Sequence, residues 1–324
     1  MEPIIFSKEL NEILEKIDYS RLGKNVAIKL HFGEKGNQTY LNPEIAKQIY
    51  EKLISLGKKA TLVETNALYK GGRTNRTDHI KTAKSHGFDF APIDILDGEL
   101  GEEFVEVEGR KLGKGLKKYD SLLVLTHFKG HMFAGFGGAI KNLSMGLASR
   151  AGKLDMHSKT RPIINSKKCS GCGNCIKHCN AKAIILENNY AIIDRSKCEG
   201  CAMCIAVCPN NAVAIPWGSK NVEELQRALT EYAKAGLKII PKEKRVYINV
   251  LKNITPDCDC MDIKQKPMTE DIGFLLGYDP VAIDQASLDL VNKEGFDKIN
   301  KINKQAQINY AEEIGLGKKE YKII

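Results

Sequence analysis

The sequence predicts an α/β protein whose mainly parallel sheet domain is interrupted by a smaller, cysteine-rich unit of the α+β class. Two observations predict this arrangement. Apolar runs of strand length alternate with helix-length amphipathic segments in both the first and the last part of the chain. Between these parts, eight of the ten cysteines are confined to residues 169–208. We therefore expect residues 1–158 and 219–324 to form one discontinuous α/β domain, with residues 160–218 inserted into it.

The part before the cysteines shows the alternation of strands and helices that is typical of a parallel sheet. One helix has a complete start and stop signature, with Asn42 as N-cap, Pro43 at its first position and Gly57 at its end. The run Ser121–Thr126 is nearly all apolar, as expected of a strand buried on both faces. The other elements expected here are strands at Asn25–Leu30 and Ala60–Glu64 and a helix at Thr77–His86.

The part after the cysteines resumes the same pattern. We expect an amphipathic helix at Val222–Leu237 and strands at Arg245–Val250 and Ile272–Gly277. A further helix should follow, with Asp279 as its N-cap and Pro280 at its first position. These residues are therefore expected to complete the sheet that begins in the N-terminal part.

The cysteines form two copies of one pattern, offset by 29 residues. Each copy reads Cys-x2-Cys-x2-Cys-x3-Cys, and Pro209 follows the second copy. This spacing is that of bacterial ferredoxins, in which three cysteines of one run hold a 4Fe–4S cluster and the fourth reaches the other cluster. The pattern thus predicts a ferredoxin-type domain with two 4Fe–4S clusters. The expected ligands are Cys169, Cys172, Cys175 and Cys208 for one cluster, and Cys198, Cys201, Cys204 and Cys179 for the other.

Other uses of these cysteines explain the pattern less well. A structural zinc ion needs only four ligands, which leaves the third and fourth cysteines at fixed spacing unexplained. A disulfide framework is not expected in a chain without a secretory signal. Asn180 departs from the ferredoxin pattern, where proline is usual, but the ligands are intact. Both copies also end in an apolar tail, Ala183–Leu186 and Ala212–Ile215, and we expect these tails to form short strands over the clusters.

The composition indicates a globular protein in the cytoplasm. No apolar run reaches the ~18 residues that a membrane span requires, and thiolate-held clusters suit a reducing compartment. The formal charge of +9 falls to about +5 once two clusters, each of charge −2 with its thiolates, are included. Lysines are also spread among glutamates, so nucleic acid is not the expected partner. A soluble ferredoxin or reductase is the expected redox partner.

Polar residues gather where the predicted strands end, which is where open α/β sheets bind ligands. His31 follows the first strand, the Thr65–Arg73 loop the second, and His127 and His131 the central strand. Asp257–Cys260 and Tyr278–Pro280 follow the last strands. From these positions we expect a site for a small anionic substrate. Its candidate catalytic residues are His31, His127, His131, Lys141, Asn142 and Cys258.

A second metal site is one interpretation of the same residues. His127 and His131 would then be two ligands, and His157 or the pair Cys258 and Cys260 would complete the set. The alternative is that these histidines make ordinary hydrogen bonds. Three acidic neighbours of the two cysteines, Asp257, Asp259 and Asp262, are expected to raise the thiol pKa, which disfavours a thiolate nucleophile. This loop is therefore expected to bind a metal or an electron-deficient substrate, unless it is an incidental surface loop.

The glycine-rich stretch from Gly135 to Gly146 also has two interpretations. Its backbone amides form an anion cradle assisted by Lys141, or the glycines serve a tight packing turn. The spacing matches neither a Walker A loop nor a dinucleotide-binding fingerprint. Asp284, one turn into the last predicted helix, faces either the site or solvent.

These residues together resemble the domain-of-unknown-function family 362, in its iron–sulfur branch. The resemblance lies in Lys29–Glu34, Thr126-His127-x3-His131, Gly138-x2-Lys141-Asn142-Leu143-x2-Gly146, Lys153–His157, Cys258-Asp259-Cys260 and Asp279–Asp284. It covers almost the whole chain and implies that these scattered motifs belong to one domain. It does not imply a substrate.

Three functions are compatible with these features. The first is an oxidoreductase, in which the clusters exchange electrons with a substrate held by His127, His131, Lys141 and the Cys258 loop. The second is a non-catalytic electron-transfer subunit that uses the α/β domain for docking. The third is an assembly or metal-delivery factor in which Cys258 and Cys260 pass on a metal. Convergence of polar groups at one sheet edge favours the enzyme.

Overall fold

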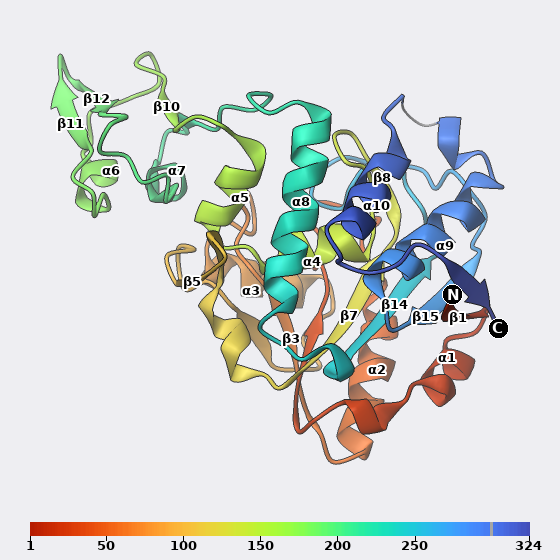
Figure 1. The fold of residues 1–324 in the computed structure, drawn as a ribbon. Coiled ribbons are helices and arrows are strands. Elements are labelled where there is room, and N and C mark those ends of the chain that lie inside the picture. Colours follow the sequence, from red (N-terminus) through yellow and green to blue (C-terminus); the bar gives the residue numbers. More distant parts are fainter. Residues whose placement is uncertain (299–300) are drawn as a thin grey trace.

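The computed structural model describes residues 1–298 and 301–324. Within these residues, eight strands form one central sheet (Figure 1). From β14 to β4 each neighbouring pair is parallel, whereas β15 runs antiparallel to both of its neighbours. The predicted mainly parallel α/β sheet is therefore confirmed, with β15 as an exception. In order across the sheet the strands are β16 (Tyr321–Ile323), β1 (Glu2–Ser7), β15 (Gly273–Gly277), β14 (Arg245–Leu251), β7 (Ser121–His127), β2 (Asn25–Lys29), β3 (Lys59–Glu64) and β4 (Ile93–Ile95).

Helices cover both faces of the sheet, because its central strands are apolar on both sides. Along β7, Leu122 and Val124 belong to one apolar core and Leu123 and Leu125 to the other. The first core includes α4 (Ala139–Leu147), α8 (Val222–Leu237), α9 (Pro280–Asn292) and α10 (Lys304–Glu313). The second includes α1 (Leu10–Lys16), α2 (Pro43–Ser55) and α3 (Arg76–Ser85).

The helices begin where the local sequence signals placed them. The side chain of Asn42 accepts a hydrogen bond from the Glu44 amide at the start of α2. At the start of α8, Asn221 and Glu224 form a capping box. Asp279 accepts from the Val281 and Ala282 amides and begins α9. These helices are fixed by residues adjacent to them in the chain, which is why the sequence could predict them.

The cysteine-rich segment lies between α5 (Arg150–His157) and α8 and projects from the sheet domain in Figure 1. Its strands pair across the two sequence copies: β10 (Ile163–Ile164) with β13 (Val213–Ala214), and β11 (Ile184–Glu187) with β12 (Tyr190–Ile193). The helices α6 (Asn174–Lys177) and α7 (Met203–Val207) carry the third cysteine of each copy. Strands β11 and β13 lie where the apolar tails predicted strands.

The segment is connected to the sheet domain both at its base and through packed side chains. At its base, the hydroxyls of Ser158 and Ser219 are 2.8 Å apart, so the chain enters and leaves at one place. Higher up, Leu68 and Leu154 of the sheet domain share an apolar cluster with Cys175, Cys204 and Cys208. The segment is therefore packed against the sheet domain as well as joined to it.

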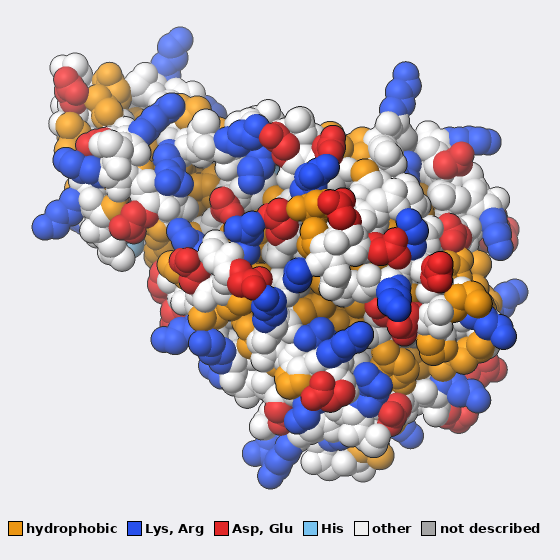
Figure 2. All heavy atoms as spheres, in the orientation of Figure 1, with side chains coloured by type: hydrophobic (Ala, Val, Ile, Leu, Met, Phe, Trp, Pro, Cys, Tyr) orange, Lys and Arg blue, Asp and Glu red, His pale blue; other side chains and the backbone are white. Residues whose placement is uncertain are grey.

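The surface in Figure 2 carries acidic and basic side chains interspersed over the visible face of the sheet domain. No helix among residues 1–298 and 301–324 is long and apolar enough to cross a membrane.

Candidate functional site

A cavity of about 1390 Å³ lies at the carboxyl ends of β2, β3, β7 and β14. The loops that follow these strands line it with His31, Arg73, His131 and Cys258. Helices α4 and α8 contribute other parts of the wall, and Trp217 of the cysteine-rich segment lies in it as well. The structure thus brings together the loops whose polar residues the sequence singled out.

One of the predicted loops does not take part. Tyr278–Pro280 follow β15, and because β15 runs antiparallel to β14, its end lies at the opposite edge of the sheet. There the Tyr278 hydroxyl accepts a hydrogen bond from the Asp18 amide at 3.0 Å, and Asp279 accepts from the Lys318 amide. The expectation that all these loops meet at one edge was therefore wrong for this one.

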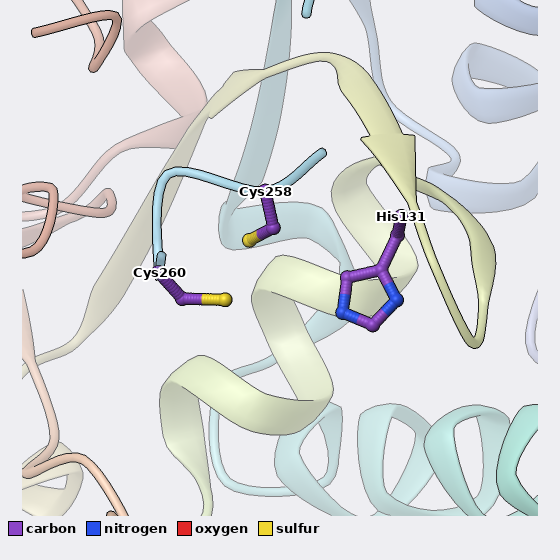
Figure 3. A group of neighbouring side chains, drawn as sticks. All are labelled: His131, Cys258 and Cys260. Carbon is purple, nitrogen blue, oxygen red and sulfur yellow. The ribbon is translucent and has the colours of Figure 1, made fainter. Parts of the chain in front are cut away.

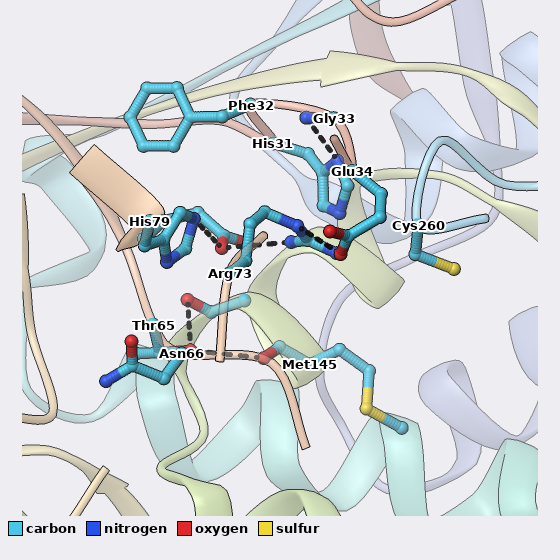
Figure 4. A network of polar contacts seen from close by, with 12 residues as sticks. His31, Phe32, Gly33, Glu34, Thr65, Asn66, Arg73, His79, Met145 and Cys260 are labelled. Atoms are coloured by element: carbon cyan, nitrogen blue, oxygen red, sulfur yellow. Dashed lines mark hydrogen bonds and ion pairs between the residues drawn. The ribbon is translucent and has the colours of Figure 1, made fainter. Parts of the chain in front are cut away.

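A buried network of charges forms the floor of the cavity (Figure 4). Arg73 lies between two carboxylates, with Nε 3.2 Å from Glu34 and Nη1 3.4 Å from Glu64. Glu64 also contacts Lys29 at 3.5 Å and His79 at 3.2 Å. Against the opposing effect of burial, Lys29 and His79 hold the pKa of Glu64 well below its usual range. These residues neutralise one another, so the network fixes the surrounding loops instead of offering a free charge.

Asn142, a candidate catalytic residue, connects this floor to α4. Its Oδ1 accepts a hydrogen bond from Lys29 Nζ at 2.8 Å, and its Nδ2 donates to Thr126 Oγ1 and to the Leu125 carbonyl, each at 3.1 Å. Close approach here requires Gly146, since a Cβ at that position would lie 2.3 Å from Lys29 Nζ. Asn142 lines the cavity but its polar atoms are engaged within the protein.

The start of α4 is occupied by a carboxylate of the protein itself. Asp284 accepts hydrogen bonds from the amides of Ala139 at 2.6 Å and Ile140 at 2.9 Å. A Cβ on Gly138 would lie 2.4 Å from the same carboxylate, which explains glycine there. Burial raises the pKa of Asp284 to about 6. The predicted anion cradle at these amides is therefore filled by Asp284, and the glycines serve close packing.

His31 and His131 lie near the ends of different strands and make the same kind of hydrogen bond through Nδ1. The amide of Gly33 donates to Nδ1 of His31 at 3.1 Å, and the amides of Phe133 and Ala134 donate to Nδ1 of His131 at 3.1 and 3.0 Å. Nδ1 is thus an acceptor in both rings, so each neutral ring carries its proton on Nε2. Burial, together with the charge of Lys141, lowers the pKa of His131 to about 3. Both histidines are therefore neutral hydrogen-bond donors.

His127 is engaged on both sides of its ring. Nε2 donates to the Lys252 carbonyl at 2.9 Å, and Nδ1 lies 3.1 Å from Lys129 Nζ and 2.9 Å from the Asp259 carboxylate. Burial and the ammonium group of Lys129 lower the pKa of His127 to about 3. Its contacts hold the loop after β14 in place, and they leave neither nitrogen directed at a ligand.

The loop with Cys258 and Cys260 is a tight turn that neighbouring loops fasten from several sides. The Met261 amide donates to the Cys258 carbonyl at 3.1 Å, which closes the turn. The Glu34 amide donates to the Asp259 carbonyl at 2.8 Å, and the Tyr69 hydroxyl donates to the Cys260 carbonyl at 2.7 Å. Loops from different strand ends therefore fix the position of both thiols.

The environment of Cys258 is cationic, contrary to the sequence-based expectation. Lys141 Nζ lies 3.3 Å from Cys258 Sγ. The hydrogen bond from Cys260 and the charges of Lys141 and Lys129 hold the pKa of Cys258 well below its usual range. The acidic neighbours do not prevent this, because the Asp259 carboxylate contacts Lys129 and His127 instead. The surroundings of Cys258 favour its thiolate form, and the expectation of a raised thiol pKa was wrong.

The predicted metal ligands are only partly brought together. The ligand atoms of His131, Cys258 and Cys260 lie within 4.8 Å of one another, and Figure 3 shows both sulfur atoms and one ring nitrogen facing a common space. His127 makes the contacts described above. The ring of His157 packs edge-on against Trp217 at a centroid distance of 4.8 Å, although it also lines the cavity.

Several residues of the site were not among the sequence candidates. Lys29 and Glu64 are the last residues of two neighbouring strands and each follows an apolar residue, a signal that could have indicated a buried pair. Lys153 donates to Thr65 Oγ1 at 2.5 Å and lines the cavity. Its position on α5 gave no comparable signal.

Comparison with curated proteins found no relative. Eight chains of solved structures match, and one of them is the lactate racemase apoprotein from Thermoanaerobacterium thermosaccharolyticum. The identity is 15% and the TM-score 0.38, with 77% of this chain and 50% of that chain covered. The protein thus spans about half the length of that structure, and a likeness this distant supports no conclusion about activity.

A family model gives a broader match. The family described as "Domain of unknown function (DUF362)" matches residues 26–289, from β2 into α9. This range includes the strand ends that form the cavity and the whole cysteine-rich segment. On this match, the chain belongs to the DUF362 family.

Proposed function

We propose that the protein is an oxidoreductase in which residues 160–218 hold two 4Fe–4S clusters and the cavity binds a small anionic substrate. The clusters would supply or accept single electrons. The observation that carries the proposal is the cavity itself, which places a thiolate among hydrogen-bond donors and also contacts the cysteine-rich segment. The proposed cluster ligands are Cys169, Cys172, Cys175 and Cys208, and Cys198, Cys201, Cys204 and Cys179.

The backbone of the cysteine-rich segment supports this ligand set, because its irregular conformations repeat with the sequence offset of 29 residues. Positive φ angles occur at the paired positions Gly171 and Gly200 (66° and 72°) and Gly173 and Ala202 (72° and 62°). Ala202 is notable because a side chain disfavours that conformation. Matching conformations at equivalent positions support the proposal that both copies hold the same kind of cluster.

The thiols have surroundings that suit thiolate ligands. The Ala183 amide donates to Cys179 Sγ at 3.2 Å, and the Ala212 amide makes the equivalent bond to Cys208 Sγ at 3.2 Å. Such donors stabilise sulfur that carries negative charge. A small cavity of the segment is lined by the four cysteines proposed for the first cluster, Cys169, Cys172, Cys175 and Cys208. The donor set and its surroundings therefore fit the clusters.

Leu68 connects the two parts of the proposed site. It lines the large cavity, and it belongs to the apolar cluster that contains Cys175, Cys204 and Cys208. Arg150 holds the loop of Leu68 in place by donating to the Leu68 carbonyl at 3.1 Å. One layer of packed side chains thus borders both the cavity and the cysteines, which favours electron exchange between them.

The cavity favours an anion because donors converge on its inner end. Lys141 is held by a thiolate instead of a carboxylate, and His31 and His131 carry their protons on Nε2. These groups would orient a carboxylate or a developing oxyanion and stabilise its charge. Lys153, whose ammonium group lies deeper, adds to the positive potential.

A second candidate is metal delivery, favoured by the proximity of His131, Cys258 and Cys260. A ligand nitrogen must lack a proton, whereas the amide donors at Nδ1 leave the proton of His131 on Nε2. The lysine beside Cys258 also opposes a bound cation. The anionic substrate is therefore preferred.

The cluster assignment is tested on anaerobically purified full-length protein by iron analysis and EPR spectroscopy. About eight irons per chain and a spin-coupled signal after dithionite reduction are expected. Cys208→Ser should remove one cluster and the spin coupling, whereas Cys258→Ser, which lies outside the repeat, should leave both unchanged. Stoichiometric zinc with little iron, or equal iron loss in both variants, would overturn the assignment.

A further inference from the structure

We propose that Cys258 and Cys260 form a redox-active dithiol that reduces an anionic disulfide bound in the cavity. In this reaction the pair itself closes to a disulfide. The inference deepens the proposed function by naming a substrate class, and it depends on that function only for the electrons that regenerate the dithiol.

The first support is the geometry of the turn. The two sulfur atoms lie within 4.8 Å of each other, and both residues line the cavity. A disulfide requires sulfur atoms about 2 Å apart, so closure needs side-chain rotation within a turn that the backbone has already formed. The hydrogen bond from the Met261 amide to the Cys258 carbonyl keeps that turn closed. The two thiols are therefore placed to react with each other as well as with a ligand.

The second support is the unequal chemistry of the two thiols. Cys258 lies 3.3 Å from the ammonium group of Lys141, and Cys260 donates a hydrogen bond to it. That bond is the main reason why the pKa of Cys260 is raised well above its usual range. One thiolate beside one protonated thiol is the arrangement that a nucleophile and a resolving cysteine require.

The third support is the position of the acid group that lies between the two cysteines in sequence. The Asp259 carboxylate, adjacent in sequence to both cysteines, is turned to Lys129 and His127. Asp257 also lines the cavity, where burial and the charge of Cys258 raise the pKa of its carboxyl. Lys141, Lys129 and His31 all act on Cys258 in the direction that lowers its pKa, which suits the approach of a substrate that carries negative charge.

The reaction balances without a further reagent. Cys258–S⁻ attacks one sulfur of R–S–S–R, the substrate S–S bond breaks, R–S⁻ leaves and Cys258–S–S–R forms. Cys260 then transfers its proton to R–S⁻ and attacks the sulfur of Cys258, which expels the second R–S⁻. The products are one R–SH, one R–S⁻ and the Cys258–Cys260 disulfide, so the substrate gains two electrons and the protein loses two. Two electrons, delivered in single-electron steps, and one proton restore the Cys258 thiolate and the Cys260 thiol.

The cavity wall suggests what R contains. Near the thiols it offers Lys141 and the Nε2–H groups of the two histidines, which suit a carboxylate. Further out it is apolar, with Trp217, Phe133 and Met132 all partly exposed. A disulfide of an aromatic carboxylic acid matches both parts, and 5,5′-dithiobis(2-nitrobenzoate) is therefore the probe of choice.

The experiment uses anaerobic, full-length protein as purified with its metal content. The wild type should release two thionitrobenzoate ions more than the Cys258→Ser/Cys260→Ser double variant and retain no adduct by intact mass. Cys260→Ser should release one ion more than the double variant and retain a mixed disulfide, because the resolving thiol is missing. Cys258→Ser should react far more slowly than Cys260→Ser. Circular dichroism and iron content, measured on each sample, show whether the variants are folded.

Charge preference is measured with a matched pair of aliphatic probes. The anionic 3,3′-dithiodipropionate should oxidise the dithiol roughly ten times faster than neutral bis(2-hydroxyethyl) disulfide, as electrostatic steering predicts. Equal rates would overturn the anionic substrate class.

Other outcomes would overturn the dithiol. Two stable adducts on the wild type would show that the thiols react independently. If the thiols react with the probe only after a chelator has removed a stoichiometric metal, the same residues form a metal site. The proposed function is tested separately by the iron analysis. Absence of iron would overturn that function and would not affect the thiol chemistry.

Discussion

At the scale of single residues, the contact between Lys141 and Cys258 governs the chemistry of the cavity. We expect Lys141→Gln to move the pH profile of Cys258 alkylation by iodoacetamide to higher pH. The reason is that only the thiolate reacts, and removal of the neighbouring cation raises the thiol pKa. Peptide mass spectrometry at a series of pH values gives the profile.

The control for this prediction is Lys70→Gln, because Lys70 lines the same cavity but is exposed. That variant should keep the profile of the wild type. If both variants shift it equally, the general potential of the cavity decides the pKa of Cys258, and the direct contact does not.

The same residues show where sequence reasoning stops. The loops with His31, His131 and Cys258 were correctly expected at one edge of the sheet, because parallel strands end together. The electrostatics of Cys258 could not be derived, because the hydrogen bond from Cys260 depends on the shape of the turn and the cations Lys141 and Lys129 are more than a hundred positions away. The adjacent acidic residues suggested a raised thiol pKa. In the structure the Asp259 carboxylate contacts Lys129 instead of the thiol.

At the scale of elements, α4 depends on a carboxylate from α9. Asp284→Ala would leave the Ala139 and Ile140 amides buried without that acceptor, so we expect a loss of about 1–3 kcal/mol in the free energy of unfolding. Urea denaturation followed by circular dichroism measures it. Because α4 carries Lys141, the alkylation rate of Cys258 should fall as well.

A matched variant distinguishes this effect from simple loss of a helix cap. Asn42→Ala removes the cap of α2 on the other face of the sheet and should cost about 1 kcal/mol. It should leave Cys258 alkylation unchanged. An equal decrease in both variants would mean that stability alone limits the reactivity of Cys258.

Elements were predictable to the extent that their signals are local. Asn42 and Asp279 each cap the helix that follows them directly, and both were predicted as caps from the sequence. Asp284 caps a helix 145 positions earlier, which no local pattern reveals. The direction of β15 was equally hidden, because an apolar run is the same in a parallel and an antiparallel strand.

At the scale of the whole molecule, Leu154 joins the sheet domain to the cysteine-rich segment. Leu154→Ala should cost about 2–5 kcal/mol, because the side chain is almost fully buried in the shared apolar cluster. Hydrogen exchange is expected to increase in residues 160–218 and around Leu68, while β7 and β14 stay protected. The comparison variant is Leu53→Ala, which empties the core beneath α2. It should increase hydrogen exchange in α2 and leave exchange in residues 160–218 unchanged. If Leu53→Ala increased exchange in residues 160–218 and Leu154→Ala did not, the junction would lie elsewhere.

The division of the chain was predictable from composition, because cysteines and their spacing mark the segment clearly. The way in which the segment packs against the sheet domain was not predictable. Leu68 and Leu154 have no feature that separates them from other core leucines, and the junction depends on the packing of surfaces that meet only in the folded chain.

The hydrogen bond between Ser158 and Ser219 has a consequence for the history of such a protein. Because the two ends of the segment touch, its loss or gain changes the path of the sheet domain by only a few ångströms. Strands β10 and β13, one at each end, also pair with each other, so the segment closes on itself. The adjacent ends make a single in-frame insertion the simplest origin of the segment, followed by adaptation of the packing around Leu68 and Leu154. The same junction would let the segment be exchanged for another unit whose two ends lie equally close together.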